Sequence, residues 1–192
     1  MSRVAIAAAA LVAACASPPA PAPATASARS PAVAPRPAPA HPVLANADFE
    51  DPPIAGRPCA PRWECSAHVH AGAFRYVVAN EGASGAASLC IERVGSEPWA
   101  LITQGFHTRA LANKRLRLSM AVRADGLEGG AGPWVQSQGG RAHAQKLVKS
   151  TKGWERVAVD LDVPADSNLI VVGATLEGGG RACFDDVRLE VI

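Results

Sequence analysis

Apolar and polar residues alternate with a period of two over most of the chain beyond residue 42. The segments "KRLRLSMAVRA" (114–124) and "WERVAVDLDVP" (154–164) each place aliphatic side chains on one face and charged side chains on the other. This period is typical of β-strands with one buried face, because successive side chains in a strand point to opposite sides. Both segments therefore predict half-buried strands.

Six further segments have the composition of short strands. They read "FRYVVA", "ASLCIERV", "WALITQGF", "GPWVQSQ", "NLIVVGATLEG" and "ACFDDVRLEVI". Clusters of glycine, proline and asparagine separate them, as expected of turns, and no long helical stripe is present. The pattern predicts an all-β fold for residues 43–192: an antiparallel β-sandwich or jelly roll formed as one domain.

The first residues have the pattern of an export signal. Residues 1–14 hold one early cation, Arg3, and then a short apolar run that ends in small residues. Val12 to Cys15 resembles a bacterial lipobox, which implies cleavage before Cys15 and a lipid on its thiol, with acyl chains such as palmitate. Ordinary secretion, with cleavage after Ala14-Cys15-Ala16, is the alternative.

Residues 15–42 predict a linker. Nine of the sixteen prolines lie in this stretch, together with many alanines. Such a composition cannot bury a core and favours an extended chain. The expected arrangement is a bacterial envelope lipoprotein, anchored in a bilayer on the outer-membrane or periplasmic side, with one folded domain held away from it.

The charge balance argues against nucleic-acid binding. The chain has 19 Lys and Arg against 17 Asp and Glu, and three of the cations precede residue 43. The remaining 16 cations nearly balance the 17 acids, whereas a nucleic-acid-binding domain normally has a basic excess.

The cysteines agree with export. Four remain after Cys15, and an even number in an exported domain suggests two disulfides with three possible pairings. We favour Cys59–Cys65, which flank a short loop, and Cys90–Cys183, which lie in expected strands. Free thiols and a zinc site are the alternatives, although no pair has zinc-ligand spacing.

Several segments together resemble the galactose-binding-like jelly rolls, the fold group that includes many carbohydrate-binding modules. They are "NADFEDP" at residue 46, the stretch from residue 113 to 140, and the stretch from 153 to 190 that includes "FDDVRLE". The resemblance implies a binding domain rather than an enzyme. It also implies a possible structural calcium near the first and last strands, for which we expect Asp48, Glu50, Asp185 and Asp186 as carboxylate ligands. A bulge, or capping of local backbone N–H groups, is the alternative role for Asp185 or Asp186.

The chain has few aromatic residues, so few positions could form a sugar-binding platform. Trp63 in the cysteine loop and Trp134 beyond a glycine-rich turn are candidates for exposed sugar platforms, with core packing as the alternative for each. Gln136 and Gln138 alternate with Val135 and Ser137, so both are expected on one polar face near Trp134. Trp99 is expected in the core, and Trp154 is expected to be structural.

The remaining candidate metal-binding and catalytic motifs are weak. His68 and His70 share the spacing of one strand face but have no identifiable third metal ligand, which favours a surface or capping role. No nucleophile elbow or phosphate loop is present. The sequence therefore predicts a non-catalytic lipoprotein that binds a glycan or another envelope ligand. The alternative is a structural or protein-interaction lipoprotein without a small ligand.

Overall fold

The computed structural model describes residues 43–138 and 141–192. Within these residues the chain forms ten strands and one 3₁₀ turn, η1 (Ala71–Ala73). The strands are β1 (Glu64–Ala67), β2 (Phe74–Ala79), β3 (Ser88–Arg93), β4 (Trp99–His107), β5 (Arg115–Ala124), β6 (Gly130–Ser137), β7 (His143–Gln145), β8 (Glu155–Asp162), β9 (Leu169–Glu177) and β10 (Arg181–Val191).

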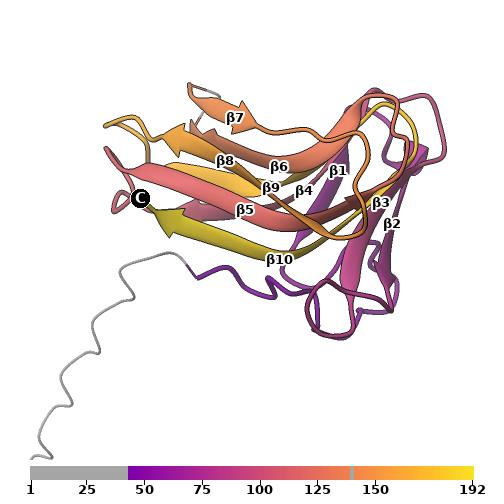
Figure 1. Cartoon of the computed structure of the whole chain (residues 1–192). Coiled ribbons are helices and arrows are strands. Elements are labelled where there is room, and N and C mark those ends of the chain that lie inside the picture. Colours follow the sequence, from indigo (N-terminus) through magenta and orange to yellow (C-terminus); the bar gives the residue numbers. More distant parts are fainter. Residues whose placement is uncertain (1–42, 139–140) are drawn as a thin grey trace, which may run out of the picture. The chain divides into compact units, whose positions relative to one another are not determined.

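The strands form two antiparallel sheets of five. Sheet A has the order β1-β4-β9-β6-β7, and sheet B has the order β2-β3-β10-β5-β8. Figure 1 shows the two sheets stacked in layers. The predicted antiparallel sandwich is confirmed.

The core lies between the sheets and follows the period-two patterns of the sequence. In β5, Leu116, Leu118, Met120 and Val122 are fully buried, while Arg115 and Arg117 on the opposite face are exposed. Phe184 of β10 and alternate residues of β9 complete the core. Stacked sheets of this kind bury one face of each and leave the other face of each open, so the described domain has two outer faces.

A buried glutamine holds the chain where it enters the domain. Gln104 of β4 accepts a hydrogen bond from the Ala45 backbone N–H at 3.0 Å and donates one to the Ala45 carbonyl at 2.6 Å. The side-chain amide thus pairs with the backbone as a neighbouring strand would. A buried amide is stable only when its donors and acceptors have partners, and here Ala45 supplies both.

Both favoured disulfides are present. Cys59 bonds to Cys65, which ties an irregular loop to the start of β1. Cys90 bonds to Cys183 between directly opposite positions of β3 and β10 in sheet B.

The two short edge strands of sheet A, β1 and β7, have four and three residues and were not predicted from the sequence. A run that short carries too few alternations to stand out. The signal segment 1–14, Cys15 and the linker 15–42 lie outside the described residues. Within the described ranges, none of the secondary structure is an apolar helix of membrane-spanning length.

Candidate functional site

The outer face of sheet A carries a hollow lined by two tryptophans. Its volume is about 400 Å³, and β4, β6, β7 and β9 each contribute two residues to its wall. We call it the tryptophan hollow. Its lining residues are Trp99, Leu101, Trp134, Gln136, His143, Gln145, Thr175 and Glu177.

Strand register explains why these side chains share one face. Trp99 lies opposite Glu177, Leu101 opposite Thr175, and Trp134 opposite Gln145. The residues between them, such as Ala100 and Val135, are fully buried. Period-two alternation therefore places every lining residue on the outer face.

A glycine of β9 lies directly opposite Trp134. Gly173 lies between Thr103 of β4 and Trp134 of β6, in one row across three strands. A Cβ at Gly173 would stand 1.8 Å from the Ile102 carbonyl oxygen, so no larger residue fits there. Gly173 therefore places no side chain beside Trp134.

The two tryptophans are too far apart to contact the same small ring. Trp99 and Trp134 lie two strands apart, and Trp134 shares its row with Thr103, four residues along β4 from Trp99. Strand spacing and rise then separate their Cα atoms by roughly 16 Å. The hollow accordingly suits an extended ligand with more than one ring.

Of the polar side chains in the hollow, one pair is joined by a hydrogen bond and another pair has no hydrogen-bond partner among the described residues. Gln145 donates a hydrogen bond from Nε2 to Glu177 Oε1 at 2.9 Å. Gln136 and His143 are opposite each other in β6 and β7, and neither side chain has a hydrogen-bond partner within the described part of the chain. Between them, an amide and an imidazole offer both donors and acceptors to a ligand.

A buried carboxylate supports the rim beside Trp99. Glu97 is 8% exposed, and its oxygens accept hydrogen bonds from the backbone N–H groups of Val69 and His70 and lie 3.2 Å from His68 Nδ1. The His68 ring meets the Trp99 ring edge-on, with centroids 5.4 Å apart. The histidines thus take part in the loop that holds Trp99, in line with the surface or capping role expected for them.

The expectation that Trp63 is an exposed platform is wrong. Trp63 is 5% exposed, and its ring packs against Phe49 with centroids 5.2 Å apart. Its indole N–H donates to the Asn46 carbonyl at 2.8 Å. The alternative role, core packing, applies because the short disulfide loop turns this side chain inward.

The glutamine prediction holds for one of the two residues. Gln136 lines the hollow beside Trp134, as expected. Gln138 is exposed beyond the end of β6 and is not among the lining residues. Trp99, expected in the core, is instead partly exposed and forms one wall. Its outward position is visible in hindsight, because Trp99 alternates with Ala100 and Ile102.

The four carboxylates expected to bind calcium do not form a ligand set. Asp185 Oδ2 accepts the N–H groups of Ala83 and Ser84, at 2.7 and 2.8 Å. Glu50 Oε1 accepts two other N–H groups of the same loop, at 2.7 and 2.8 Å. Among residues 43–138 and 141–192, no three His, Cys, Asp or Glu side chains are placed to hold a metal ion.

The other two expected ligands, Asp186 and Asp48, do not join such a set among the described residues either. Asp186 forms ion pairs with Arg156 and Arg188, so two cations already neutralise it. Asp48 is exposed in a turn. The pairing of β10 with β5 shifts register between Asp185 and Arg188, which matches the alternative of a bulge. As placed, Glu50 and Asp185 hold a loop, and Asp186 lies at the strand irregularity.

Burial sets the ionisation of Asp185. Its residue is 0% exposed, and desolvation raises the pKa of its carboxyl above the ordinary value, although N–H groups of Ser84, Asp186 and Ala83 act in the opposite direction. A carboxylate that is enclosed by its own backbone donors is a structural group, so Asp185 is not available to a ligand.

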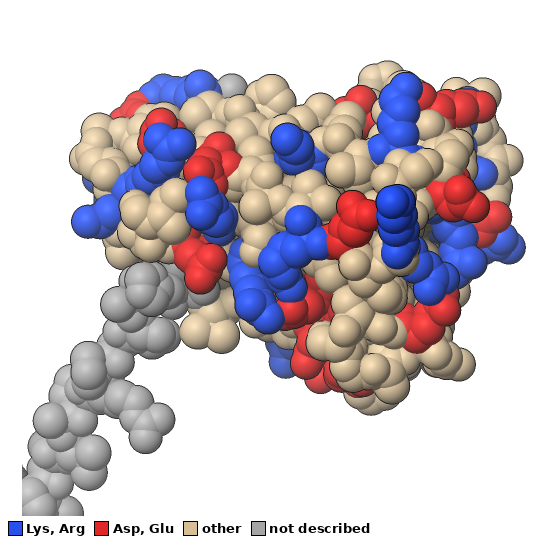
Figure 2. Space-filling view, in the orientation of Figure 1, with Lys and Arg blue, Asp and Glu red and all other residues tan. Residues whose placement is uncertain are grey.

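The outer face of sheet B differs in character from that of sheet A. Figure 2, viewed with β5 and β10 in front, shows basic and acidic side chains interspersed over the surface. Many of them are paired, as in Arg117 with Asp160 and Arg75 with Glu92. Paired surface charges keep such a face soluble without offering an apolar platform.

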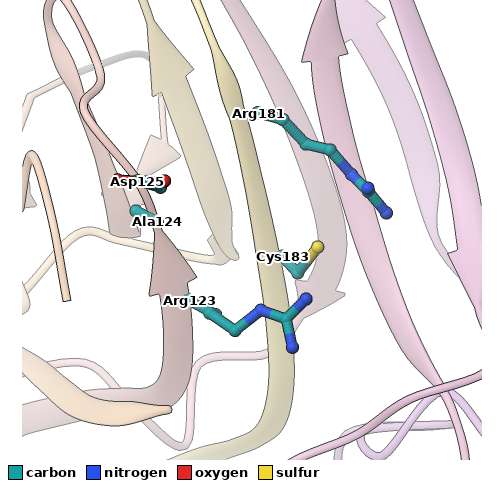
Figure 3. Close-up of a pocket in the computed structure, with 5 residues that line it drawn as sticks. All are labelled: Arg123, Ala124, Asp125, Arg181 and Cys183. Carbon is teal, nitrogen blue, oxygen red and sulfur yellow. The ribbon is translucent and has the colours of Figure 1, made fainter. Parts of the chain in front are cut away.

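A smaller hollow of about 220 Å³ lies on sheet B beside the Cys90–Cys183 disulfide. In Figure 3 the side chains of Arg123 and Arg181 project to the same side as the Cys183 sulfur. Arg123 is already bonded to Glu81 and lies over the Trp154 ring, 5.5 Å from its centroid. This hollow therefore has less binding capacity left than the tryptophan hollow.

Comparison with known proteins supports the fold. The sequence matches no family profile. It is 27% identical over 112 residues to an uncharacterized HTH-type transcriptional regulator, YbfP, of Bacillus subtilis (strain 168); the match covers 55% of this chain and 37% of that protein. The chain thus spans little more than a third of this curated relative.

Solved structures share the sandwich at low sequence identity. TmCBM61, solved in complex with β-1,4-galactotriose, has a TM-score of 0.53 and 17% identity, covering 78% of this chain and 97% of that one. A CBM4 structure has a TM-score of 0.51 and 18% identity, covering 78% and 100%. The enzymatically active domain of a bacteriophage CBA120 tailspike protein has a TM-score of 0.55 and 12% identity, covering 78% and 21%. The jelly-roll fold of carbohydrate-binding modules is therefore confirmed for this chain.

Proposed function

We propose that this domain is a non-catalytic glycan-binding module whose site is the tryptophan hollow on the outer face of sheet A. The observation that carries the proposal is the pair of partly exposed indoles, Trp99 and Trp134, in one hollow on the outer face of the sheet. The shared fold with carbohydrate-binding modules supports it.

The chemistry of the hollow suits a sugar. A sugar ring has an apolar face of C–H groups and an edge of hydroxyls, so it needs a flat apolar surface beside hydrogen-bonding groups. Indoles give large rigid surfaces, and Gln136 and His143 stand at the edge with donors and acceptors. Few polar groups among aromatic walls are typical of a small-molecule site.

The carboxylate content of the hollow supports binding without hydrolysis. Glycoside hydrolysis generally uses two carboxyl groups on either side of the scissile bond. Among the lining residues of the hollow, Glu177 alone is acidic, and Gln145 holds one of its oxygens. The domain accordingly lacks, within this hollow, the pair that the reaction needs.

The proposal extends to where the module is displayed. The lipobox-like segment and the proline-rich linker favour a lipid on Cys15 and an extended tether to the bacterial envelope. Radiolabelled palmitate supplied to expressing cells tests this directly. We expect label in the wild type and none in a Cys15→Ser variant; label in neither would contradict the anchor.

A glycan array with the purified full chain tests the site. We expect binding to at least one oligosaccharide, with affinity lowered at least tenfold by Trp134→Ala and by Trp99→Ala. Buried tryptophans at interfaces commonly contribute about 2 kcal/mol or more, and tenfold corresponds to about 1.4 kcal/mol. Trp154→Ala, on the other side of the sandwich, is the matched control and should bind as the wild type does.

Two outcomes would contradict this function. Unchanged affinity in both hollow variants would place the site elsewhere. Folded protein that binds no glycan at all would favour the alternative of a protein-interaction lipoprotein, to be sought by cross-linking in the envelope.

A further inference from the structure

We propose a second subsite beside the first, in which Arg57 and Arg62 bind an anionic group, so that the ligand is an acidic glycan rather than a neutral one. This inference rests on the proposed glycan-binding function and adds the class of ligand. We call the subsite the arginine loop; it comprises residues 57–65, closed by the Cys59–Cys65 disulfide.

Unpaired charge is the first observation. Eight other arginines of the described chain lie within 4.0 Å of a carboxylate: Arg75, Arg93, Arg115, Arg117, Arg123, Arg141, Arg156 and Arg188. Arg57 and Arg62 have no such partner among the described residues, and residues 1–42 contain no Asp or Glu. Their guanidinium groups are therefore free to bind an external anion.

Two other arginines share the lack of an ion pair but not the setting. Arg181 donates a hydrogen bond to Cys90 Sγ, and Arg109 lies on an exposed turn. Arg57 and Arg62, in contrast, stand together in concave surface.

The shape of the surface is the second observation. Arg57 and Arg62 both line two hollows, of about 610 and 330 Å³. One acid stands in each, Glu64 in the larger and Asp51 in the smaller. Each hollow thus has two cations and one acid. Neither carboxylate lies within 4.0 Å of a guanidinium, so neither arginine is neutralised by an ion pair with it.

The third observation is that a disulfide and a hydrogen bond hold the loop in place. Arg62 has a φ of 71°, a left-handed conformation that is uncommon for a residue with a side chain. It is held between Pro61, whose carbonyl accepts a hydrogen bond from Asn46 Nδ2, and the buried Trp63. A guanidinium presented from a fixed backbone loses less entropy when it binds, and backbone strain of this kind is concentrated at functional sites.

Strand register links the arginine loop to the tryptophan hollow. Glu64 of β1 lies opposite Thr103, which lies opposite Gly173, which lies opposite Trp134. This row crosses β6, β9, β4 and β1, and three strand spacings amount to about 14 Å. A ligand stacked on Trp134 reaches the arginine loop only as an oligomer that carries its anion some 14 Å away.

Guanidinium geometry specifies the kind of group. Its planar fork of N–H donors pairs with two oxygens of a carboxylate or a sulfate at once. The shared chemistry is a glycan with anionic substituents, which uronic acids or sulfate esters would both supply.

Calorimetry on the full chain with matched oligosaccharides tests the inference. The probes are β-1,4-linked glucan and galactan oligomers in three forms: neutral, oxidised at C6 to uronates, and sulfated at C6. At low salt we expect the uronate or the sulfate form to bind at least tenfold more tightly than the neutral form, with the preference reduced at 0.5 M salt. The better of the two forms identifies the source of the anion.

Two double variants separate the site from the overall charge. Arg57→Gln/Arg62→Gln should abolish the preference for the acidic form and leave the neutral affinity unchanged. Lys149→Gln/Lys152→Gln removes the same charge from exposed lysines without ion pairs and should keep the preference.

Each remaining outcome decides one of the two proposals. Equal binding of neutral and acidic forms, or equal loss in both double variants, would overturn the acidic-glycan inference while leaving the glycan-binding function standing. Acidic binding that depends on the arginines but not on Trp134 would support the arginine loop and contradict the tryptophan hollow. Binding of none of the six probes would overturn the inference, and the wider array described above would then decide the function.

Discussion

The two disulfides should differ in their contribution to stability, because they close loops of very different length. Cys90 and Cys183 are 93 residues apart in sequence, whereas Cys59 and Cys65 are six apart. A cross-link stabilises a fold largely by lowering the entropy of the unfolded chain, and this effect grows with the logarithm of the loop length. The same relation predicts about 4.6 kcal/mol for the long loop and about 2.2 kcal/mol for the short one.

The perturbation is the pair of double variants Cys90→Ala/Cys183→Ala and Cys59→Ala/Cys65→Ala. Urea unfolding followed by tryptophan fluorescence gives the free energy of unfolding for each. We expect the long-loop variant to lose more, by about 2.4 kcal/mol from loop entropy alone. Cys90 and Cys183 are 1% and 3% exposed, so their truncation also removes packing and adds to this loss.

A loss in the short-loop variant that equals or exceeds the loss in the long-loop variant would refute the reasoning. Such a result would mean that β3 and β10 stay together in the unfolded chain without a covalent bond. Wild-type protein with reduced thiols is the control, because it keeps the sulfur atoms in the core.

Two further predictions concern single residues. Gly173→Val should destabilise the domain by more than 2 kcal/mol, roughly the level of severe overpacking, since its Cβ would stand 1.8 Å from the Ile102 carbonyl oxygen. The control is Gly72→Ala, whose Cβ would meet nothing within 4 Å. Equal thermal stability of the two variants would contradict the close approach at Gly173. For Asp185, burial raises the pKa above the ordinary 3.8, so the folded state binds a proton more readily than the unfolded chain does. The contribution of Asp185 to the free energy of unfolding therefore increases as the pH falls through the raised pKa toward 3.8. The difference in unfolding free energy between wild type and Asp185→Asn, measured by urea titration from pH 7 to pH 4, should therefore change in favour of the wild type as the pH falls; a difference independent of pH would contradict it.

Alternation along the chain predicted most of the fold. Strands such as β5 and β8 were predictable because one face of each is buried, which imposes the period directly on the sequence. The disulfides followed from cysteines placed in a short loop and in two expected strands. The edge strands β1 and β7 were missed because three or four residues carry little periodic signal.

The candidate site was predictable only where a strand carried it. Trp134 and Gln136 follow the alternation of β6 and lie where it placed them. Trp63 lies in an irregular loop, where orientation depends on a contact with Asn46 seventeen residues away. No local pattern contains such a contact, so the inward turn of Trp63 was not accessible from the sequence.

The grip of Gln104 on Ala45 has a mechanical consequence. If a lipid tether holds the chain upstream and a glycan holds Trp99, a pulling force reaches the domain at Leu44, which packs against the core, and at Ala45, which passes it through two hydrogen bonds to β4. Trp99 stands on that same strand, so the load travels along β4 without crossing the sandwich. Failure of those two bonds together with release of Leu44 would lengthen the tether by a few residues and leave the ten strands intact.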